Sequence, residues 1–224
     1  MAAPLVILAI TLSGCSSSPH RAVANASPPS SPAAQPSPNA GAERLIHAAL
    51  TATGQVRSYR FSATTTVAAR QAVRTVIVGR VVRGEGLAYR LRVGQQRTQV
   101  VRTRRATFVR GVPGHWARLQ RPRPIANPTA SLRAVLAGLT ATKVSPAPGG
   151  AHRVRGSLSP AAARRAGIPT DRRPADVVVT LDRRARVTGL TISTSTSAGT
   201  HSVTVTVHST YGGFDRIARI SAPI

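Results

Sequence analysis

The stretch Thr75–Thr103, TVIVGRVVRGEGLAYRLRVGQQRTQVVRT, decides the fold of this chain. It is rich in Val and Thr with alternating Arg, and glycines interrupt it at Gly84–Gly86 and at Gly94. A period of two places alternate side chains on opposite faces of a sheet, so the stretch predicts consecutive antiparallel strands. The strands expected from it are Val73–Arg83, Ala88–Val93 and Thr98–Thr103.

The β pattern continues on both sides of this stretch. Val56–Val67 precedes it, and Thr107–Arg110 follows it before a turn at Gly111–Gly114, which gives a meander long enough to curl. Near the end of the chain, Asp182–Ala185 is a turn between two further strands. The strands expected in this second half are His152–Leu158, Asp176–Leu181, Val187–Ser193 and Ser202–Ser209.

Three helices are expected between these strands. The first is Ala42–Thr53, which Gly54 is expected to stop. A polar segment, Arg118–Pro128, leads to a second helix that Thr129 or Ser131 can cap. The apolar stripe of this second helix consists of Leu132, Val135, Leu136 and Leu139. Ser159 and Pro160 open a short third helix, as its cap and its first turn.

This order of elements describes an α+β domain with one antiparallel sheet and helices against one face. The expected interior is aliphatic, because hydrophobic residues make up 42% of the chain but aromatic residues only 3%. Aliphatic walls suit either a tight small core or a cavity for an alkyl chain, and the pattern does not choose between them.

The N-terminus carries an export signal. The apolar run Leu5–Leu12 would rise only about 12 Å as a helix, far less than the ~30 Å of a bilayer core. Leu12–Cys15 resembles the lipobox of bacterial lipoproteins, which implies that the Cys15 thiol is acylated and anchors the chain to a membrane. Export signals begin with a positively charged region, but no Lys or Arg precedes this run. Either the initiator amine alone supplies the positive charge, or the true start lies upstream.

Three regions follow from this signal. Residues 1–15 are the signal peptide and lipobox, and residues 16–40 form a Pro/Ser-rich tether that cannot bury enough apolar surface to fold. Residues 41–224 form a single domain. Cys15 is the only cysteine of the chain, so this domain is expected to fold without a disulfide.

The charge is strongly positive. The chain contains 31 basic and six acidic residues, for a net charge of +25, and Lys143 is the only lysine. Such a surface attracts anionic headgroups or anionic polymers. A GC-rich genome explains arginine in place of lysine, but not the scarcity of Asp and Glu. Nucleic acid is not an expected partner, because the chain is exported and lacks the interleaved aromatics that stack on bases.

No catalytic residues, metal site or cofactor is expected. The six acids form no evident pair, and no Gly-x-Ser-x-Gly motif is present. His201 and His208 lie seven residues apart on an expected strand and so point to opposite faces. They are expected to face solvent or to form hydrogen bonds. The chain is therefore not expected to be an enzyme.

Several strings, taken in order, resemble the actinobacterial envelope lipoproteins of the LppX/LprG type, which are related in fold to the carrier LolA. The strings are Thr107–Arg110 with Gly114–Trp116, Ser131–Leu139, Gly150–Pro160, Val177–Ile192, Tyr211–Asp215 and Ile220–Pro223. The resemblance implies a curved antiparallel half-barrel with helices on its concave face. It also implies a hydrophobic cavity between sheet and helices that takes acyl chains of envelope lipids or lipoglycans. The chain departs from the family in its basicity and in Leu181, where relatives often have Trp.

The resemblance makes Leu132, Val135, Leu136, Leu139 and Trp116 the candidate cavity lining. One hypothesis is then a lipid carrier or chaperone, lipid-anchored on the extracytoplasmic side of the cell membrane. The other is a non-catalytic sensing or interaction module, with a filled core and a basic surface that binds anionic partners. A cavity of several hundred Å³ favours the carrier, and a packed interior favours the module.

Overall fold

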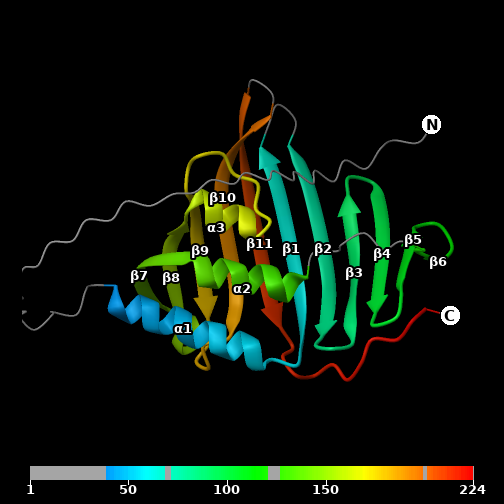
Figure 1. The fold of residues 1–224 in the computed structure, drawn as a ribbon, viewed down its shortest axis with the longest axis horizontal. Helices are drawn as coiled ribbons and strands as arrows, with labels where there is room; N and C mark the ends of the chain where they lie inside the picture. Colours follow the sequence, from blue (N-terminus) through cyan, green and yellow to red (C-terminus); the bar gives the residue numbers. More distant parts are fainter. Residues whose placement is uncertain (1–38, 69–71, 121–126, 199–200, 224) are drawn as a thin grey trace, which may run out of the picture. The chain divides into compact units, whose positions relative to one another are not determined.

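The computed structural model describes residues 39–68, 72–120, 127–198 and 201–223 (Figure 1). Its helices are α1 (Ala40–Gln55), α2 (Pro128–Gly138) and α3 (Pro160–Arg165), with a 3-10 turn at Pro148–Gly150. The first strands are β1 (Ser58–Ala68), β2 (Val73–Val82), β3 (Gly86–Val93), β4 (Gln96–Thr103), β5 (Thr107–Gly111) and β6 (Ala117–Arg118). The later strands are β7 (Leu139–Ala147), β8 (Ala151–Leu158), β9 (Ala175–Leu181), β10 (Val187–Ala198) and β11 (His201–Gly212).

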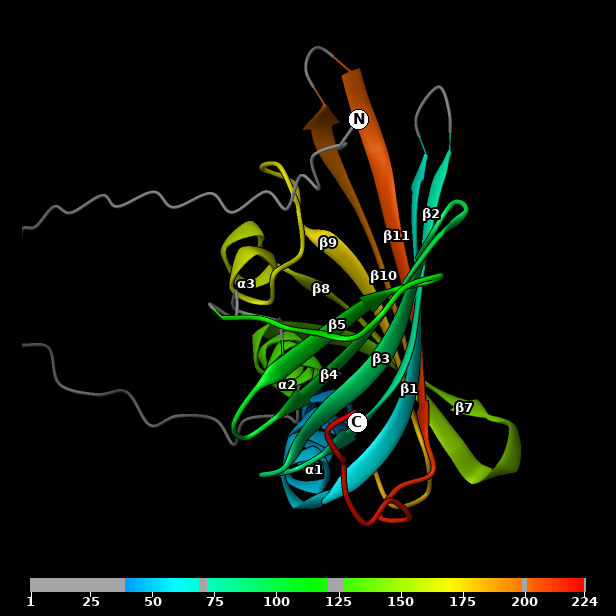
Figure 2. The same ribbon diagram turned by 90° about the vertical axis from the view of Figure 1, so that its right-hand side faces the viewer.

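These strands form one antiparallel, unclosed sheet of eleven strands, in the order β6-β5-β4-β3-β2-β1-β11-β10-β9-β8-β7. The last strand returns to pair with the first, with Phe61 opposite Tyr211, so two meanders meet at the centre of the sheet. Figure 2 shows that the sheet curves and that all three helices lie on its concave side. The predicted fold class is confirmed.

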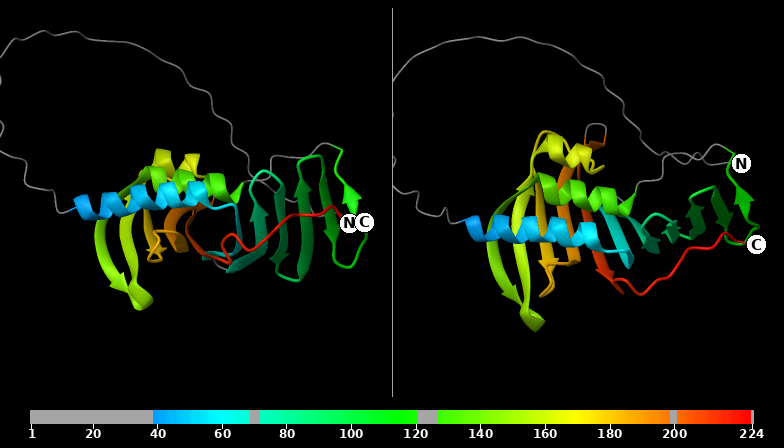
Figure 3. Two further views of the ribbon diagram at one scale, coloured as in Figure 1. Left: turned by 90° about the horizontal axis from the view of Figure 1, so that it is seen from below. Right: turned by 60° about the horizontal axis from the view of Figure 1, so that its bottom comes forward.

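The helices cover only one half of the concave face. α1 packs on β7 and β8, and α3 packs on β8, with α2 between the two helices. Figure 3 shows the helices over this half, while β3–β5 lie beyond their ends. The covered half holds a continuous aliphatic core, in which Leu136, Leu158 and Leu181 are 0–1% exposed. The helices therefore bury their apolar side chains against this half of the sheet.

The other half of the sheet has a smaller core of Tyr59, Phe61, Val81 and Leu87. These residues lie on the concave face, since the hydroxyls of Tyr59 and Thr129 of α2 are in hydrogen-bond contact. No described helix lies over β3–β5, and some concave side chains of these strands, such as Leu91 and Val109, stay partly exposed.

Several sequence-based boundaries need correction. α1 does not stop at Gly54 but continues to Gln55, and the cap of α2 is Asn127 rather than Thr129 or Ser131. The Asn127 side chain accepts a hydrogen bond from the backbone of Thr129 at 3.0 Å. Ser159 caps α3 as predicted. Of the polar segment Arg118–Pro128, which was expected to lead to the second helix, residues 121–126 lie outside the described part of the chain.

The strand β7 was not predicted. Leu139 was assigned to the apolar stripe of the second helix, but it is the residue at which α2 ends and β7 begins. β7 is an edge strand with an irregular register between Ala141 and Lys143, and it contains Pro146. Proline is tolerated there because one side of an edge strand has no ladder partner. Among the described residues, no helix has the length and apolar character that a membrane crossing requires.

Candidate functional site

A hollow of about 530 Å³ opens where the helix-covered half of the sheet gives way to the uncovered half. It lies among the C-terminal end of α1, the first turns of α2 and the adjoining ends of β1–β4. Its volume is in the range that small-molecule sites of proteins occupy, about 300–1,000 Å³.

The floor of this hollow is apolar. It consists of Val56, Tyr59, Val81 and Leu87. Tyr59 is directly opposite Val81, which is in turn opposite Leu87, so β1, β2 and β3 each contribute one side chain to a single row. Cross-strand neighbours in such a row pack closely, and a preformed floor therefore requires no rearrangement to receive a hydrocarbon group.

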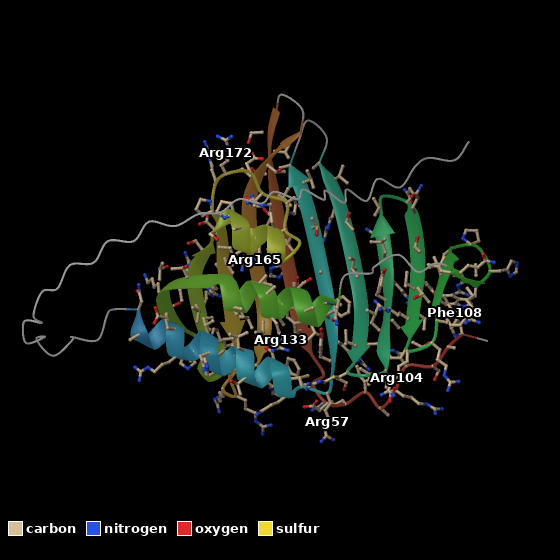
Figure 4. The ribbon with its side chains drawn as sticks, in the orientation of Figure 1. Arg57, Arg104, Phe108, Arg133, Arg165 and Arg172 are labelled. Carbon is tan, nitrogen blue, oxygen red and sulfur yellow. The ribbon has the colours of Figure 1, made fainter. Side chains whose placement is uncertain are left out.

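The rim of the hollow is basic. Its five arginines are Arg57, Arg83, Arg102, Arg104 and Arg133, and Glu85 is its one acidic residue. The Glu85 carboxylate accepts a hydrogen bond from the backbone of Ile220 at 3.2 Å, which ties the C-terminal segment to the β2–β3 turn. Figure 4 shows Arg57, Arg104 and Arg133 approaching from three different segments.

Backbone carbonyls hold two of these arginines at the rim. The Arg83 guanidinium donates to the carbonyl of Gly54, and Arg104 donates to the carbonyl of Gly84. A guanidinium carries five N–H donors, so each keeps donors for an anion. The hollow thus presents an apolar floor below a cluster of planar cations, which suits an amphipathic anion.

From this hollow an apolar surface continues along the concave face of β2–β5. Ile77, Leu91 and Val109 share this face and are partly exposed, whereas Val100 is buried. Gly79 lies in the same face, where an added Cβ would come within 2.7 Å of the Tyr89 Cβ. A side chain at that position would displace its neighbours, so glycine allows Phe61 and Tyr89 to pack directly over the backbone here.

Among the described residues, a continuous aliphatic core fills the helix-covered half. A gap of about 10 Å³ remains between Leu132, Val187, Tyr211 and Phe214. A space of that size holds at most about one water molecule. The hollow of about 530 Å³ therefore lies beside the helices, and this gap next to Leu132 is too small for a hydrocarbon chain.

The predicted lining residues occupy three different places. Leu132 borders the 10 Å³ gap, while Val135 and Leu136 are buried in the aliphatic core, and Leu139 packs against that core. Trp116 lies at the far edge of the sheet, in a separate hollow of about 420 Å³. Cys15 lies outside the described residues.

The rim arginines were missed because they belong to no shared periodic pattern: Arg57, Arg83, Arg102 and Arg104 lie at or near strand ends, whereas Arg133 lies in the middle of α2. The one available signal was Arg83, which directly precedes the turn glycine Gly84. Four separate segments bring them together, and a single sequence does not reveal that proximity.

The tyrosines of the concave face are neutral at physiological pH. Burial raises the pKa of Tyr211 to about 12, although its hydrogen bond with Ser209 offsets part of the rise. Burial also raises the pKa of Tyr59, with a partial offset from Thr129, and it raises the pKa of Tyr89. Their phenols therefore add no negative charge beside the arginine rim.

Metal ligation has no support within the described residues, where no three His, Cys, Asp or Glu side chains are grouped to hold an ion. His208 was expected to face solvent or to form a hydrogen bond. Its Nδ1 lies 3.0 Å from the hydroxyl of Thr191 on the exposed face of the sheet. The side chain of His201 lies outside the described part of the structure.

Comparison with solved structures shows a shared fold. The chain superposes on LprF from Mycobacterium bovis with a TM-score of 0.56 at 13% identity, over 85% of this chain and 99% of that one. It superposes on the lipoprotein LppX from Mycobacterium tuberculosis with a TM-score of 0.50 at 13% identity, over 81% and 98% of the two chains. No protein-family model and no curated protein matches the sequence. The resemblance drawn from the sequence is therefore confirmed in the fold, which this chain shares with the mycobacterial proteins LprF and LppX.

Proposed function

We propose that this protein is an envelope lipoprotein that binds an acyl-chain lipid with an anionic headgroup. The observation that carries the proposal is the hollow of about 530 Å³, with an apolar floor and a rim of five arginines. An acyl chain would lie on the floor and continue along the concave face of β2–β5. The headgroup would meet the guanidiniums, which bind phosphate and carboxylate in a bidentate manner.

Burial of hydrocarbon would supply most of the affinity, at about 0.8 kcal/mol for each CH₂ removed from water. No step of this function needs a proton transfer or a covalent bond to the cargo. The proposal therefore assigns a carrier or chaperone role and no catalysis. Which lipid or lipoglycan is bound would depend on how far the chain extends over the open face.

A matched pair of variants tests this site. Ile77 and Val78 are neighbours on β2, but Ile77 lies on the concave face and Val78 on the opposite face, where it is 52% exposed. Ile77→Asn should remove co-purifying lipid in native mass spectrometry, whereas Val78→Asn should retain it. The protein should be prepared from a host that makes diacyl lipids. Lipid-free spectra of the unaltered protein, together with no uptake of fluorescent phosphatidylglycerol, would refute lipid binding.

Attachment to the extracytoplasmic side of the membrane through Cys15 belongs to the same proposal. Residues 16–40 would then be a tether, and residues 41–224 the lipid-binding domain. Metabolic labelling with palmitate should mark the protein, and Cys15→Ser should abolish the label and release the chain from membranes. A label that persists in this variant would place the acyl group elsewhere.

A second candidate is an interaction module without cargo, and the packed helix-covered half favours it. In that case the basic surface alone would bind a partner. Binding of an anionic polymer that weakens with salt, in a protein that takes up no lipid, would support this function instead.

A further inference from the structure

The face of the sheet that points away from the helices is an arginine surface. Arg60 is directly opposite Arg80, and Arg92 is directly opposite Arg97. Residues opposite one another in antiparallel strands share a face, so these pairs lie on the same side as each other and away from Tyr59. With Arg74 and Arg90 they make six exposed arginines on β1–β4. We call this set, Arg60, Arg74, Arg80, Arg90, Arg92 and Arg97, the convex arginine face.

Acidic residues do not balance this surface. Residues 58–118 contain thirteen arginines and a single acid, Glu85, which lies in the β2–β3 turn at the rim of the hollow. Other basic parts of the molecule do have carboxylates, as where Arg186 pairs with Asp182 at 2.7 Å. Like charges directly opposite each other destabilise a sheet. An anion that approaches the two opposed pairs would remove that repulsion.

An aromatic hollow ends the convex arginine face at the outer edge of the sheet. Phe108 and Arg110 of β5 point to this side, and the Arg110 guanidinium lies 5.0 Å from the centre of the Trp116 ring. With His115 and Arg118 they line a space of about 420 Å³. Figure 4 shows Phe108 at this far end of the sheet. Aromatic rings beside arginine are typical of groups that settle at a membrane–water interface.

We propose that the convex arginine face docks on the surface of an anionic phospholipid bilayer, with Phe108 and Trp116 entering its headgroup layer. A bilayer matches both features, because it offers a plane of phosphates and an apolar layer just beneath it. A soluble polyanion would match the arginines but not the aromatic edge. Docking leaves the concave hollow free on the other side of the sheet, so it does not depend on cargo binding.

The test uses the full chain with Cys15→Ser, so that no acyl anchor contributes. Vesicles of phosphatidylcholine, with and without phosphatidylglycerol, are sedimented with the protein. One variant replaces four arginines of the face (Arg60→Gln, Arg80→Gln, Arg92→Gln, Arg97→Gln). The matched control removes the same charge from α3 and the segment after it (Arg164→Gln, Arg165→Gln, Arg172→Gln, Arg173→Gln), where all four residues are exposed.

Each arginine near an anionic surface contributes roughly a fivefold gain in binding. The face variant should therefore lose at least about tenfold in binding to phosphatidylglycerol vesicles, and the control much less. Equal losses in the two variants would mean that net charge alone attracts the protein, and would overturn the proposal. Binding that does not depend on phosphatidylglycerol would overturn it as well.

A second measurement needs no variant. Trp116 is the only tryptophan of the chain, so its fluorescence reports on the aromatic edge. Its emission should shift to the blue with phosphatidylglycerol vesicles, and high salt should reverse the shift. No shift on bound vesicles, or an equal response to soluble dextran sulfate, would reject docking through this edge. Ile77→Asn should dock normally, which separates failure of this proposal from failure of cargo binding.

Discussion

The hydroxyl oxygens of Tyr59 and Thr129 lie 2.8 Å apart, and this contact joins β1 to the first turn of α2. It lies at the border between the covered and the open halves of the concave face. Tyr59 also contributes to the floor of the hollow, and its ring meets Tyr211 edge-on at 5.9 Å. The position of α2 and the shape of the hollow are therefore linked through one side chain.

Tyr59→Phe should lower the free energy of unfolding by about 1 kcal/mol, because it removes the hydrogen bond and leaves the Thr129 hydroxyl without this partner. Urea denaturation measures the change. Tyr89→Phe is the matched control, since burial raises the pKa of Tyr89 without any hydrogen-bond contribution. Equal losses in both variants would show that the hydroxyl contact is not the cause.

Arg57 and Arg133 belong to the rim of the proposed lipid site. The double variant Arg57→Gln, Arg133→Gln should weaken binding of phosphatidylglycerol by about tenfold, because hydrogen bonds to a charged group are lost. Binding of uncharged diacylglycerol should not change. The control Arg44→Gln, Arg164→Gln removes the same charge at exposed helix positions. Equal losses for both lipids would indicate damage to the floor instead.

Alkaline pH should destabilise the protein through Tyr211. Its pKa is about 12 in the folded state against 10.0 in the unfolded chain, so the unfolded state releases this proton first. The stabilisation is complete below pH 10 and is lost as the pH rises toward 12, by about 2–3 kcal/mol. Urea midpoints across this window measure the loss, and Tyr211→Phe should reduce it. Phenolate absorbance with all three tyrosines titrating near pH 10 would contradict the expectation.

The β9–β10 turn depends on Asp182. Its carboxylate accepts hydrogen bonds from the backbone of Arg184 and from the backbone and side chain of Arg186, at 2.8–2.9 Å. Partial burial alone would raise the pKa of Asp182, but these bonds outweigh burial and lower it below 3.8. The carboxylate therefore stabilises the fold above pH 3.8, and that contribution is lost as the pH falls below this value.

Asp182→Asn should remove this acid dependence and cost about 1–2 kcal/mol at neutral pH. Thermal unfolding at neutral and acid pH measures both effects. Asp176→Asn, at an exposed position of β9, is the control and should cost little. A similar cost at both positions would argue against a special role of the turn.

The sequence was sufficient to predict the fold class. Apolar and polar residues alternate along each strand and glycines separate the strands, and both signals can be read from neighbouring residues alone. It failed at β7, where Leu139 continues the helical stripe of α2 without a break. It also failed to locate the hollow, since Arg57, Arg104 and Arg133 become neighbours only through tertiary packing. Val135 and Leu136 of α2 belong to the aliphatic core, whereas Thr129, Ala130 and Arg133 of the same helix line the hollow.

The sheet never closes, so two edges stay available for pairing with other chains. β6 offers only two residues, while β7 has nine but carries Lys143, an irregular register and Pro146. Short edges, charge, bulges and proline each discourage the addition of a foreign strand. Both free edges are thereby protected against aggregation, which matters for a protein whose open concave face also exposes apolar side chains.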